Sequence, residues 1–287
     1  MNSSLRRKLF NGGKSYGPLL FSGSETIAEL IAGIGYSHIV VDMEHSPVDL
    51  SKVTSILRAI DAENGCKDSS AETSTPIVRV PSHTDIAMTK RVLDLLRPPC
   101  GIMFPMIENA KQAQVAVEST RYAPHYNNGV RGCAYPFTRA SSYGKNKDYF
   151  HVDSNQNLLT IVQVESLEGI ENITEIGLVD GVDCIFLGPF DISCSMGRIG
   201  DFSSKGEVMQ VLRRAENMVL EVAKEKQNLS LSCGSGLILG GFKPPGRSTR
   251  EMFDCGYQFI CGTTDLGMLG SAASADFKSS SLLKTNR

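Results

Sequence analysis

Short hydrophobic runs alternate with amphipathic stretches along the whole chain. The runs have the length and composition of buried strands, and the stretches between them show helical spacing. Strands are predicted at residues 17–21, 38–42, 76–80, 101–105, 159–165, 183–188, 230–239 and 258–262. Helices are predicted between them, at residues 24–34, 49–61, 84–96, 110–120, 169–177, 206–226, 248–254 and from 266 onward.

Eight alternating β/α units predict one (β/α)₈ barrel domain, of the TIM type, covering residues 1–287. A doubly wound open sheet is the structural alternative, but no Gly-x-Gly-x-x-Gly follows an early strand to support it. Three segments fall outside the pattern. They are a surface-loop insertion at 64–75, a long loop at 123–157 and a C-terminal tail at 271–287.

Composition narrows the class of protein further. The formal net charge is -2, so no basic excess exists to bind nucleic acid or an anionic membrane surface. No apolar run approaches the roughly 20 residues that a membrane-spanning helix needs. The 8 cysteines include no Cys-x-x-Cys pair, which disfavours a zinc site and indicates a reduced compartment. We therefore expect a cytoplasmic protein, with a mitochondrial location less favoured because no clear presequence stands before the first helix.

Charged residues stand where the predicted strands end. Glu165 closes the fifth strand and Asp191 follows the sixth. Asp42 ends the second strand and His45 follows it, and Arg79 lies near the end of the third. Parallel strands bring their carboxyl ends to one rim, where the chemistry of α/β barrels takes place. Two carboxylates on neighbouring strands would form an oxygen-rich site for a divalent cation such as Mg²⁺ or Mn²⁺.

Each of these features also has a purely structural interpretation. Asp42 could hold the ring of His45 for proton transfer, or both could lie in a solvated loop that enters a helix. Arg79 could stabilise a substrate carboxylate or enolate oxygen, or it could form a structural salt bridge with a rim carboxylate, including Glu165 or Asp191. The number of carboxylates at this rim exceeds the number of cations, which favours a metal ion.

The sequence resembles the HpcH/HpaI aldolase family, the class II pyruvate-type aldolases related to citrate lyase β subunits. The resemblance runs from about Leu5 to Leu269, and its strength lies in the order of several motifs. The matching segments are Asp42-Met43-Glu44-His45-Ser46-Pro47, Pro76-Ile77-Val78-Arg79-Val80-Pro81, Arg121-Tyr122-Ala123-Pro124, Gly129-Val130-Arg131-Gly132, Gln163-Val164-Glu165 and Gly188-Pro189-Phe190-Asp191-Ile192-Ser193.

The resemblance implies a modified barrel with a catalytic divalent metal. Glu165 and Asp191 match the metal ligands of the family, with Mg²⁺ or Mn²⁺ favoured and Co²⁺ or Zn²⁺ as alternatives. Arg79 matches the arginine that stabilises the enolate. His45 matches the acid–base residue, and Asp42 matches the residue that orients it.

Other positions are implied to bind the substrate or a neighbouring subunit. Gln163 matches a supporting polar residue, and Gly188 with the backbone of Phe190 matches the cradle for the substrate carboxylate. Asp94 matches a carboxylate that reaches the site of a neighbouring subunit. The family pattern implies a homohexamer, a trimer of dimers, with exchanged C-terminal helices. Residues 234–246 depart from the family pattern.

These expectations combine into a metal-dependent carbon–carbon lyase. We expect it to cleave a 4-hydroxy-2-oxo acid, such as a 2-keto-3-deoxy sugar acid or a 2,4-dihydroxyhept-2-enedioate-like compound, to pyruvate and an aldehyde. The alternatives are citramalyl- or malyl-CoA lyase chemistry, enolate chemistry of the macrophomate synthase kind, and a catalytically inactive barrel scaffold. This substrate class does not specify which aldehyde is released or in which pathway the enzyme acts.

Overall fold

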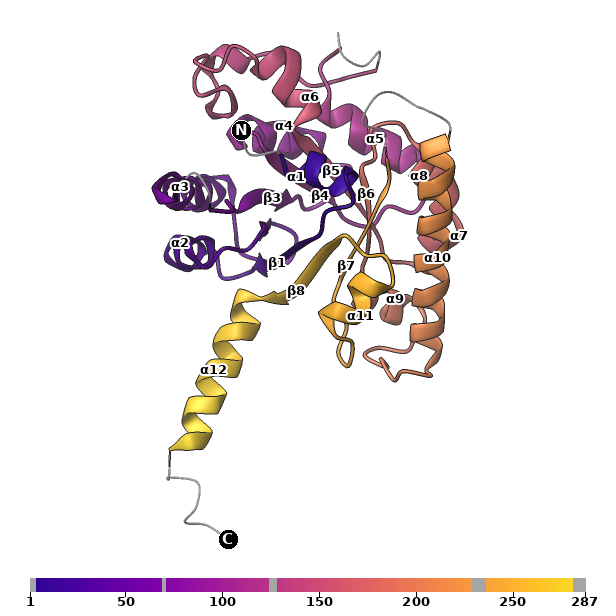
Figure 1. Ribbon diagram of the computed structural model, residues 1–287. Helices are drawn as coiled ribbons and strands as arrows, with labels where there is room; N and C mark the ends of the chain where they lie inside the picture. Colours follow the sequence, from indigo (N-terminus) through magenta and orange to yellow (C-terminus); the bar gives the residue numbers. More distant parts are fainter. Residues whose placement is uncertain (1–3, 69–70, 124–127, 229–235, 281–287) are drawn as a thin grey trace.

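Eight parallel strands form a closed barrel in the computed structural model, which describes residues 4–68, 71–123, 128–228 and 236–280 (Figure 1). Each strand pairs with the next along the chain, and β1 also pairs with β8. This arrangement confirms the predicted (β/α)₈ barrel. The strands are β1 (Ser15–Leu20), β2 (His38–Asp42), β3 (Thr75–Arg79), β4 (Cys100–Phe104), β5 (Leu158–Val164), β6 (Cys184–Leu187), β7 (Ile238–Phe242) and β8 (Phe259–Thr264).

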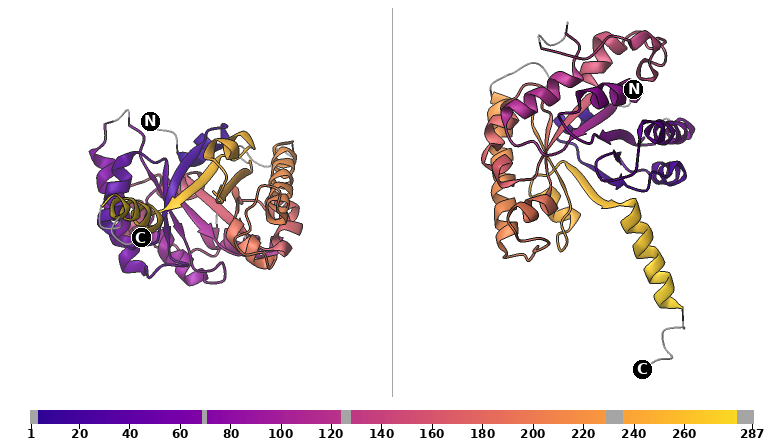
Figure 2. Two further views of the ribbon diagram at one scale, coloured as in Figure 1. Left: turned by 90° about the horizontal axis from the view of Figure 1, so that it is seen from below. Right: turned by 180° about the vertical axis from the view of Figure 1, so that it is seen from behind.

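Most helices surround the barrel, whereas α12 projects away from it, as the view from behind shows (Figure 2). Two differences from the predicted helices bear on the site. The predicted helix at 169–177 is two helices, separated at Asn172, whose side-chain amide donates to the Glu108 carbonyl. A short helix directly after β6 was not predicted. The helices are α1 (Leu5–Phe10), α2 (Glu25–Ile34), α3 (Leu50–Cys66), α4 (Ile86–Leu95), α5 (Ala110–Thr120), α6 (Ser154–Gln156), α7 (Leu167–Glu171), α8 (Ile173–Leu178), α9 (Pro189–Ser195), α10 (Glu207–Asn228), α11 (Thr249–Asp254) and α12 (Asp265–Ser279).

The barrel accommodates a proline, Pro18, in β1, where β1 pairs with β8 and closes the sheet. Pro18 has no N–H to donate, and the register between β1 and β8 shifts around it, from Gly17 opposite Cys261 to Leu19 opposite Thr264. The shift keeps Leu19 in the barrel interior. At the opposite end of the barrel, α1 inserts Leu5 and Leu9 into the same interior cluster, so this end is closed by a helix.

His38 lies in the barrel interior. Its side chain is fully buried and stacks on Phe259, with ring centroids 4.0 Å apart. Its Nδ1 atom lies 2.6 Å from the Ser15 hydroxyl and its Nε2 atom 3.6 Å from the Cys261 sulfur. Burial lowers the pKa of His38 to about 3, so the ring is neutral at physiological pH.

The seventh strand corrects one prediction. It was expected at 230–239 but runs from Ile238 to Phe242, and residues 230–235 lie outside the described residues. Gly240 and Gly241 resemble a turn in the sequence, yet both are in the strand. A Cβ on Gly240 would lie 2.8 Å from the Cys184 sulfur, and one on Gly241 would lie 2.6 Å from the Tyr257 ring. Close packing on both faces therefore requires glycine here.

Two of the segments predicted as irregular are partly regular. The expected loop at 64–75 begins inside α3, which extends to Cys66, and Thr75 is the first residue of β3. The Asn64 side chain donates to the carbonyl of Ser74 and accepts from its N–H, each at 2.9 Å, which fixes the connection. Of the predicted tail at 271–287, the residues up to Ser279 continue α12.

The described part of the long segment at 123–157, from residue 128 onward, packs on the outside of the barrel (Figure 1). It contains the 3₁₀ helices η2 (Tyr135–Phe137) and η3 (Arg139–Ser141), the π-helix η4 (Tyr149–Asp153) and α6. Its aromatic residues form a small core of their own, and Arg139 pairs with Asp61 of α3 at 2.7 Å. Among the described helices, none is long and apolar enough to cross a membrane.

Candidate active site

A cavity of about 310 Å³ opens at the carboxyl end of the barrel. The last residues of β3, β7 and β8 line it, namely Arg79, Phe242 and Thr264. Seven residues predicted for the site lie in its wall, so the structure brings them together at one rim of the barrel. These residues are His45, Arg79, Gln163, Glu165, Gly188, Phe190 and Asp191.

Glu165 is the most constrained carboxylate in the cavity. It follows β5 directly and is 3% exposed. Its Oε1 atom accepts the N–H of Met106 at 2.8 Å, and its Oε2 atom accepts the side-chain amide of Gln163 at 3.0 Å. Burial, together with repulsion from Asp191 and Glu44, raises the pKa of Glu165 to about 8 despite the opposing effects of Met106 and Arg79. Because burial is the largest cause of this shift, a further positive charge nearby would favour the ionised carboxylate.

Asp191 reaches the cavity from the unpredicted helix α9. Gly188 is the N-cap of this helix and Pro189 stands at its first position, where a missing N–H costs nothing. Asp191 lies in the first turn, close to the positive end of the helix dipole. Unlike Glu165 it is exposed, so it can accept a ligand from solvent without a large desolvation cost.

Arg79 lies at the centre of a buried charge network. Asp42 is its register partner on β2, and the two side chains form a hydrogen bond of 2.6 Å from Nε to Oδ1. The Nη1 group donates to the side-chain oxygen Oε1 of Gln163 at 3.4 Å. Burial disfavours the guanidinium charge, but the bond to Asp42 and the neighbouring carboxylates outweigh it and raise the pKa of Arg79. Arg79 is therefore charged at every physiological pH.

The predicted orientation of His45 by Asp42 is wrong in this structure. Asp42 is fully buried and accepts the backbone N–H groups of Glu44 and His45 as well as the Arg79 guanidinium. The His45 ring points elsewhere: its side chain is 58% exposed and its Nε2 atom lies 3.7 Å from Glu44. The buried guanidinium has the greater need for a counter-charge, because water already solvates the exposed imidazole.

Two residues close to the site, Glu44 and Met106, were not among the predicted site residues. Glu44 forms an ion pair with Arg79, with 3.0 Å between its Oε2 atom and Nη1, and among the described residues this buried oxygen accepts no hydrogen bond. Met106 adopts φ 50°, which is rare for a residue with a side chain. This conformation aims its N–H at Glu165. Glu44 stands in the Asp42–His45 motif, whereas no sequence signal marks Met106.

A divalent cation fits the residues present. Among the described residues no group of three or more His, Cys, Asp or Glu side chains forms a complete metal cage. Mg²⁺, however, is usually held by one or two carboxylates, with water and substrate oxygens as its other ligands. Glu165 and Asp191 both line the cavity and supply such a pair, and their mutual repulsion adds to the effect of burial on the pKa of Glu165.

Gly188 gives a test of this geometry. A methyl group on Gly188 would overlap the Oε2 atom of Glu165 and lie 2.8 Å from its Cβ atom. Gly188→Ala should therefore displace the carboxylate and weaken Mn²⁺ binding by about tenfold or more in calorimetric titration. Gly65→Ala is the matched control, because a Cβ there meets nothing within 4 Å. Equal Mn²⁺ affinity in both variants would argue against Glu165 as a ligand.

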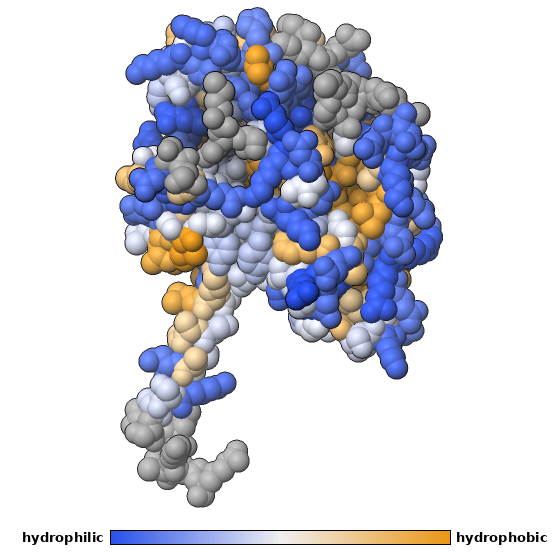
Figure 3. Space-filling view, viewed as in Figure 1, coloured by the Kyte–Doolittle hydropathy of each residue, from blue (hydrophilic) through white to orange (hydrophobic). Residues whose placement is uncertain are grey.

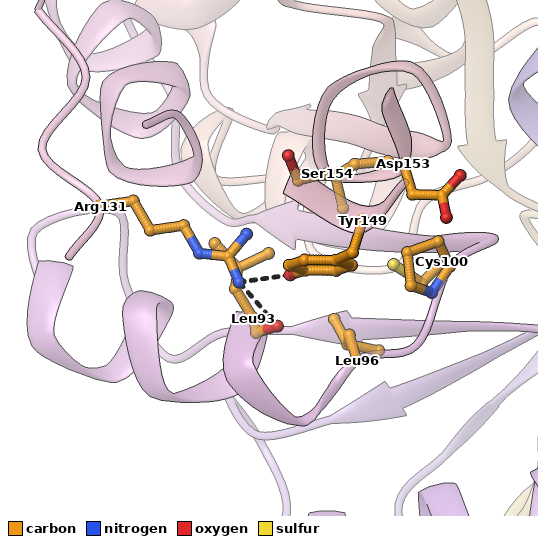
Figure 4. Close-up of a pocket in the computed structure, with 9 residues that line it drawn as sticks. Leu93, Leu96, Cys100, Arg131, Tyr149, Asp153 and Ser154 are labelled. Carbon is orange, nitrogen blue, oxygen red and sulfur yellow. Dashed lines mark hydrogen bonds between the residues drawn. The ribbon is translucent and has the colours of Figure 1, made fainter. Parts of the chain in front are cut away.

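Asp94 does not approach this cavity. It lies in the last turn of α4 and pairs with Arg131 at 3.1 Å. Figure 4 shows the Arg131 guanidinium bonded to Tyr149 and to the carbonyl of Leu93. The same small pocket is lined by Cys100 and Leu158, the first residues of β4 and β5, so Asp94 lies toward the amino end of the barrel. Its predicted role in a neighbouring subunit stays a prediction.

Comparisons with known proteins agree with this fold. The hydroxypyruvate/pyruvate aldolase of Paraburkholderia phytofirmans is 35% identical over 263 residues, which cover 91% of each chain. The 5-keto-4-deoxy-D-glucarate aldolase of Shigella boydii is 31% identical over 244 residues, covering 85% of this chain and 83% of its own. These names confirm the predicted lyase class.

A solved structure of an HpcH/HpaI aldolase/citrate lyase family protein from Burkholderia cenocepacia is also similar. It superposes with a TM-score of 0.81 at 32% identity, covering 96% of this chain and 97% of its own. The HpcH/HpaI aldolase/citrate lyase family pattern itself matches residues 19–233. This chain therefore belongs to the HpcH/HpaI aldolase/citrate lyase family.

Proposed function

We propose that this protein is a divalent-metal-dependent class II aldolase that cleaves a 4-hydroxy-2-oxo acid to pyruvate and an aldehyde. The observation that carries the proposal is the convergence of Glu165, Asp191, Arg79 and Gln163 on one cavity at the carboxyl end of the barrel. The names of the relatives, which act on pyruvate-type and keto-deoxy-sugar-acid compounds, support the same reaction class.

The bound cation would be held by Glu165 and Asp191 and would supply Lewis-acid polarisation of the substrate 2-oxo group. The chain's own residues provide the remaining chemistry. Hydrogen bonds from Nε to Asp42 and from Nη1 to Gln163 fix the position of Arg79. Among the described residues no group accepts a hydrogen bond from its Nη2 atom, so Nη2 is available to a substrate oxygen. It stabilises negative charge as that charge develops on the oxygen.

Cleavage begins at the 4-hydroxyl group of the substrate. His45, at the cavity wall, accepts the hydroxyl proton, directly or through water. The C3–C4 bond breaks as the C4–O bond becomes a carbonyl. The electron pair of the broken C3–C4 bond passes to C3 and forms the enolate of pyruvate. Protonation of C3 then gives pyruvate, and the aldehyde leaves. No oxidant or reductant is consumed.

Removal of the metal tests this function directly. Pyruvate release from a panel of 4-hydroxy-2-oxo acids should fall by about a hundredfold or more in EDTA and return on addition of Mg²⁺ or Mn²⁺. Activity that persists in EDTA would contradict the metal mechanism. A protein that binds Mn²⁺ but releases no pyruvate from any panel member would instead be an inactive scaffold.

We further propose that the protein assembles as a homohexamer through α12. This helix projects away from the barrel, and apolar side chains along it are exposed (Figure 3). Leu266, Leu269 and Phe277 have no apolar cover within the described part of the chain. A neighbouring copy that receives the helix would bury them.

Light scattering tests this assembly. The full chain should have the mass of six copies, and Leu269→Glu should give smaller species because a charge enters the buried face. A monomeric parent protein would contradict the proposal.

The cytoplasmic location stays a prediction, and it is supported by cysteines that are all unpaired in the described residues.

A further inference from the structure

One side of the active-site cavity is aromatic. Phe190 of α9 and Phe242 at the end of β7 form part of its wall, with ring centroids 5.9 Å apart and planes inclined by 67°. Phe202, in the loop that follows α9, packs against Phe190 from behind at 5.0 Å and 75°. These edge-to-face contacts are the preferred geometry of aromatic pairs. Phe190 is nevertheless 46% exposed, which leaves apolar ring surface uncovered beside the catalytic carboxylates.

A third ring, from Phe21, completes this wall. Asp265, which is buried at the start of α12, accepts the N–H groups of Phe21 and Ser22 at 2.8 and 3.1 Å. The ring is thereby held near Arg79, whose guanidinium carbon lies 5.9 Å from the ring centroid. The aromatic side of the cavity therefore begins directly beside the guanidinium that the proposed mechanism uses, and its backbone is fixed in advance of binding.

Charge around the cavity disfavours a second anionic group on the substrate. Among the lining residues, all of which are described, Arg79 is the sole guanidinium or ammonium group, and Asp42 and Gln163 already engage it. Lys243 follows Phe242 but does not line the cavity. A carboxylate at the far end of the substrate would meet phenyl rings there and would be desolvated without a partner.

Resting on the proposed function, we infer that the aldehyde partner of this enzyme carries an uncharged aromatic group, which binds between Phe21, Phe190 and Phe242. The cavity volume of about 310 Å³ lies at the lower end of the ~300–1,000 Å³ typical of small-molecule sites, so it suits pyruvate together with one ring. In the direction of synthesis, C3 of pyruvate loses a proton and forms a bond to the aldehyde carbon. The carbonyl electron pair passes to the aldehyde oxygen, which takes up a proton and becomes the 4-hydroxyl group.

The acceptor preference can be measured with three probes. In the presence of pyruvate and Mn²⁺, benzaldehyde should be converted to 4-hydroxy-2-oxo-4-phenylbutanoate with a kcat/KM at least tenfold above those of succinic semialdehyde and glyceraldehyde. A preference for either of the latter two would overturn the inference. Exchange of the pyruvate methyl protons in D₂O, followed by NMR, reports on the donor half of the reaction separately.

Substitution of one ring then locates the acceptor site. Phe242→Ala should lower kcat/KM for benzaldehyde at least tenfold, mainly through KM, and reduce its advantage over glyceraldehyde. Phe253→Ala is the control, because that ring packs against Lys14 and does not line the cavity. Equal benzaldehyde kinetics in the two variants would overturn the inference. If the parent protein exchanges the methyl protons of pyruvate but shows no preference for benzaldehyde, only this inference is contradicted. If it catalyses neither exchange nor aldol addition, the proposed function is contradicted as well.

Discussion

Replacing Asp191 with asparagine should abolish metal-supported turnover, lowering kcat by about a thousandfold, while the fold stays intact. The reason lies in the different surroundings of the two carboxylates. Asp191 is exposed in the first turn of α9, and among the described residues no side chain depends on it for a hydrogen bond. Its carboxylate can therefore be neutralised with little effect on stability, whereas cation binding loses half of its negative charge.

Glu165→Gln should have the same effect on turnover for the same electrostatic reason. Its Oε1 atom can still accept from Met106, but the new amide NH₂ would face the amide of Gln163. We expect Mn²⁺ titration and pyruvate release to fail together in both variants. Glu171→Gln is the control, because Glu171 forms an exposed pair with Arg214 on the outside of the barrel. Normal turnover in Asp191→Asn would rule out the metal pair.

Replacing Arg79 with methionine should remove both activity and stability. The substitution leaves Asp42 fully buried without its guanidinium partner, and breaking such a pair costs about 3–5 kcal/mol of unfolding free energy. In the proposed mechanism it also removes the cation that stabilises the developing enolate oxygen, so we expect kcat/KM to fall by about 10²–10³.

A second buried arginine separates these two effects. Arg247 pairs with Glu216 away from the cavity, and both side chains are almost as buried as those of Arg79 and Asp42. Arg247→Met should therefore lower stability in urea unfolding to a similar extent, yet its folded fraction should release pyruvate at the normal rate. If Arg79→Met lost no more activity than Arg247→Met, Arg79 would have only a structural role.

The sequence alone determined the barrel and the rim. Eight strand-like runs, each followed by helical spacing, have few solutions other than a closed parallel barrel, because parallel strands need a crossover between them. Once that is known, residues that follow the runs, such as Glu165 and Asp191, must share one face. This is why most of the predicted site residues line a single cavity.

Tertiary structure alone decided which side chains pair within the rim. In the sequence, the spacing of Asp42 and His45 suggests a dyad, but the register between β2 and β3 places Asp42 beside Arg79. The glycines of β7 look like strand breakers until Cys184 and Tyr257 are seen packed against them. Phe21 and Phe242 become neighbours of the catalytic groups only when β1 and β7 take their places in the closed barrel. In each case the deciding contact joins residues far apart in the chain, where local pattern carries no information.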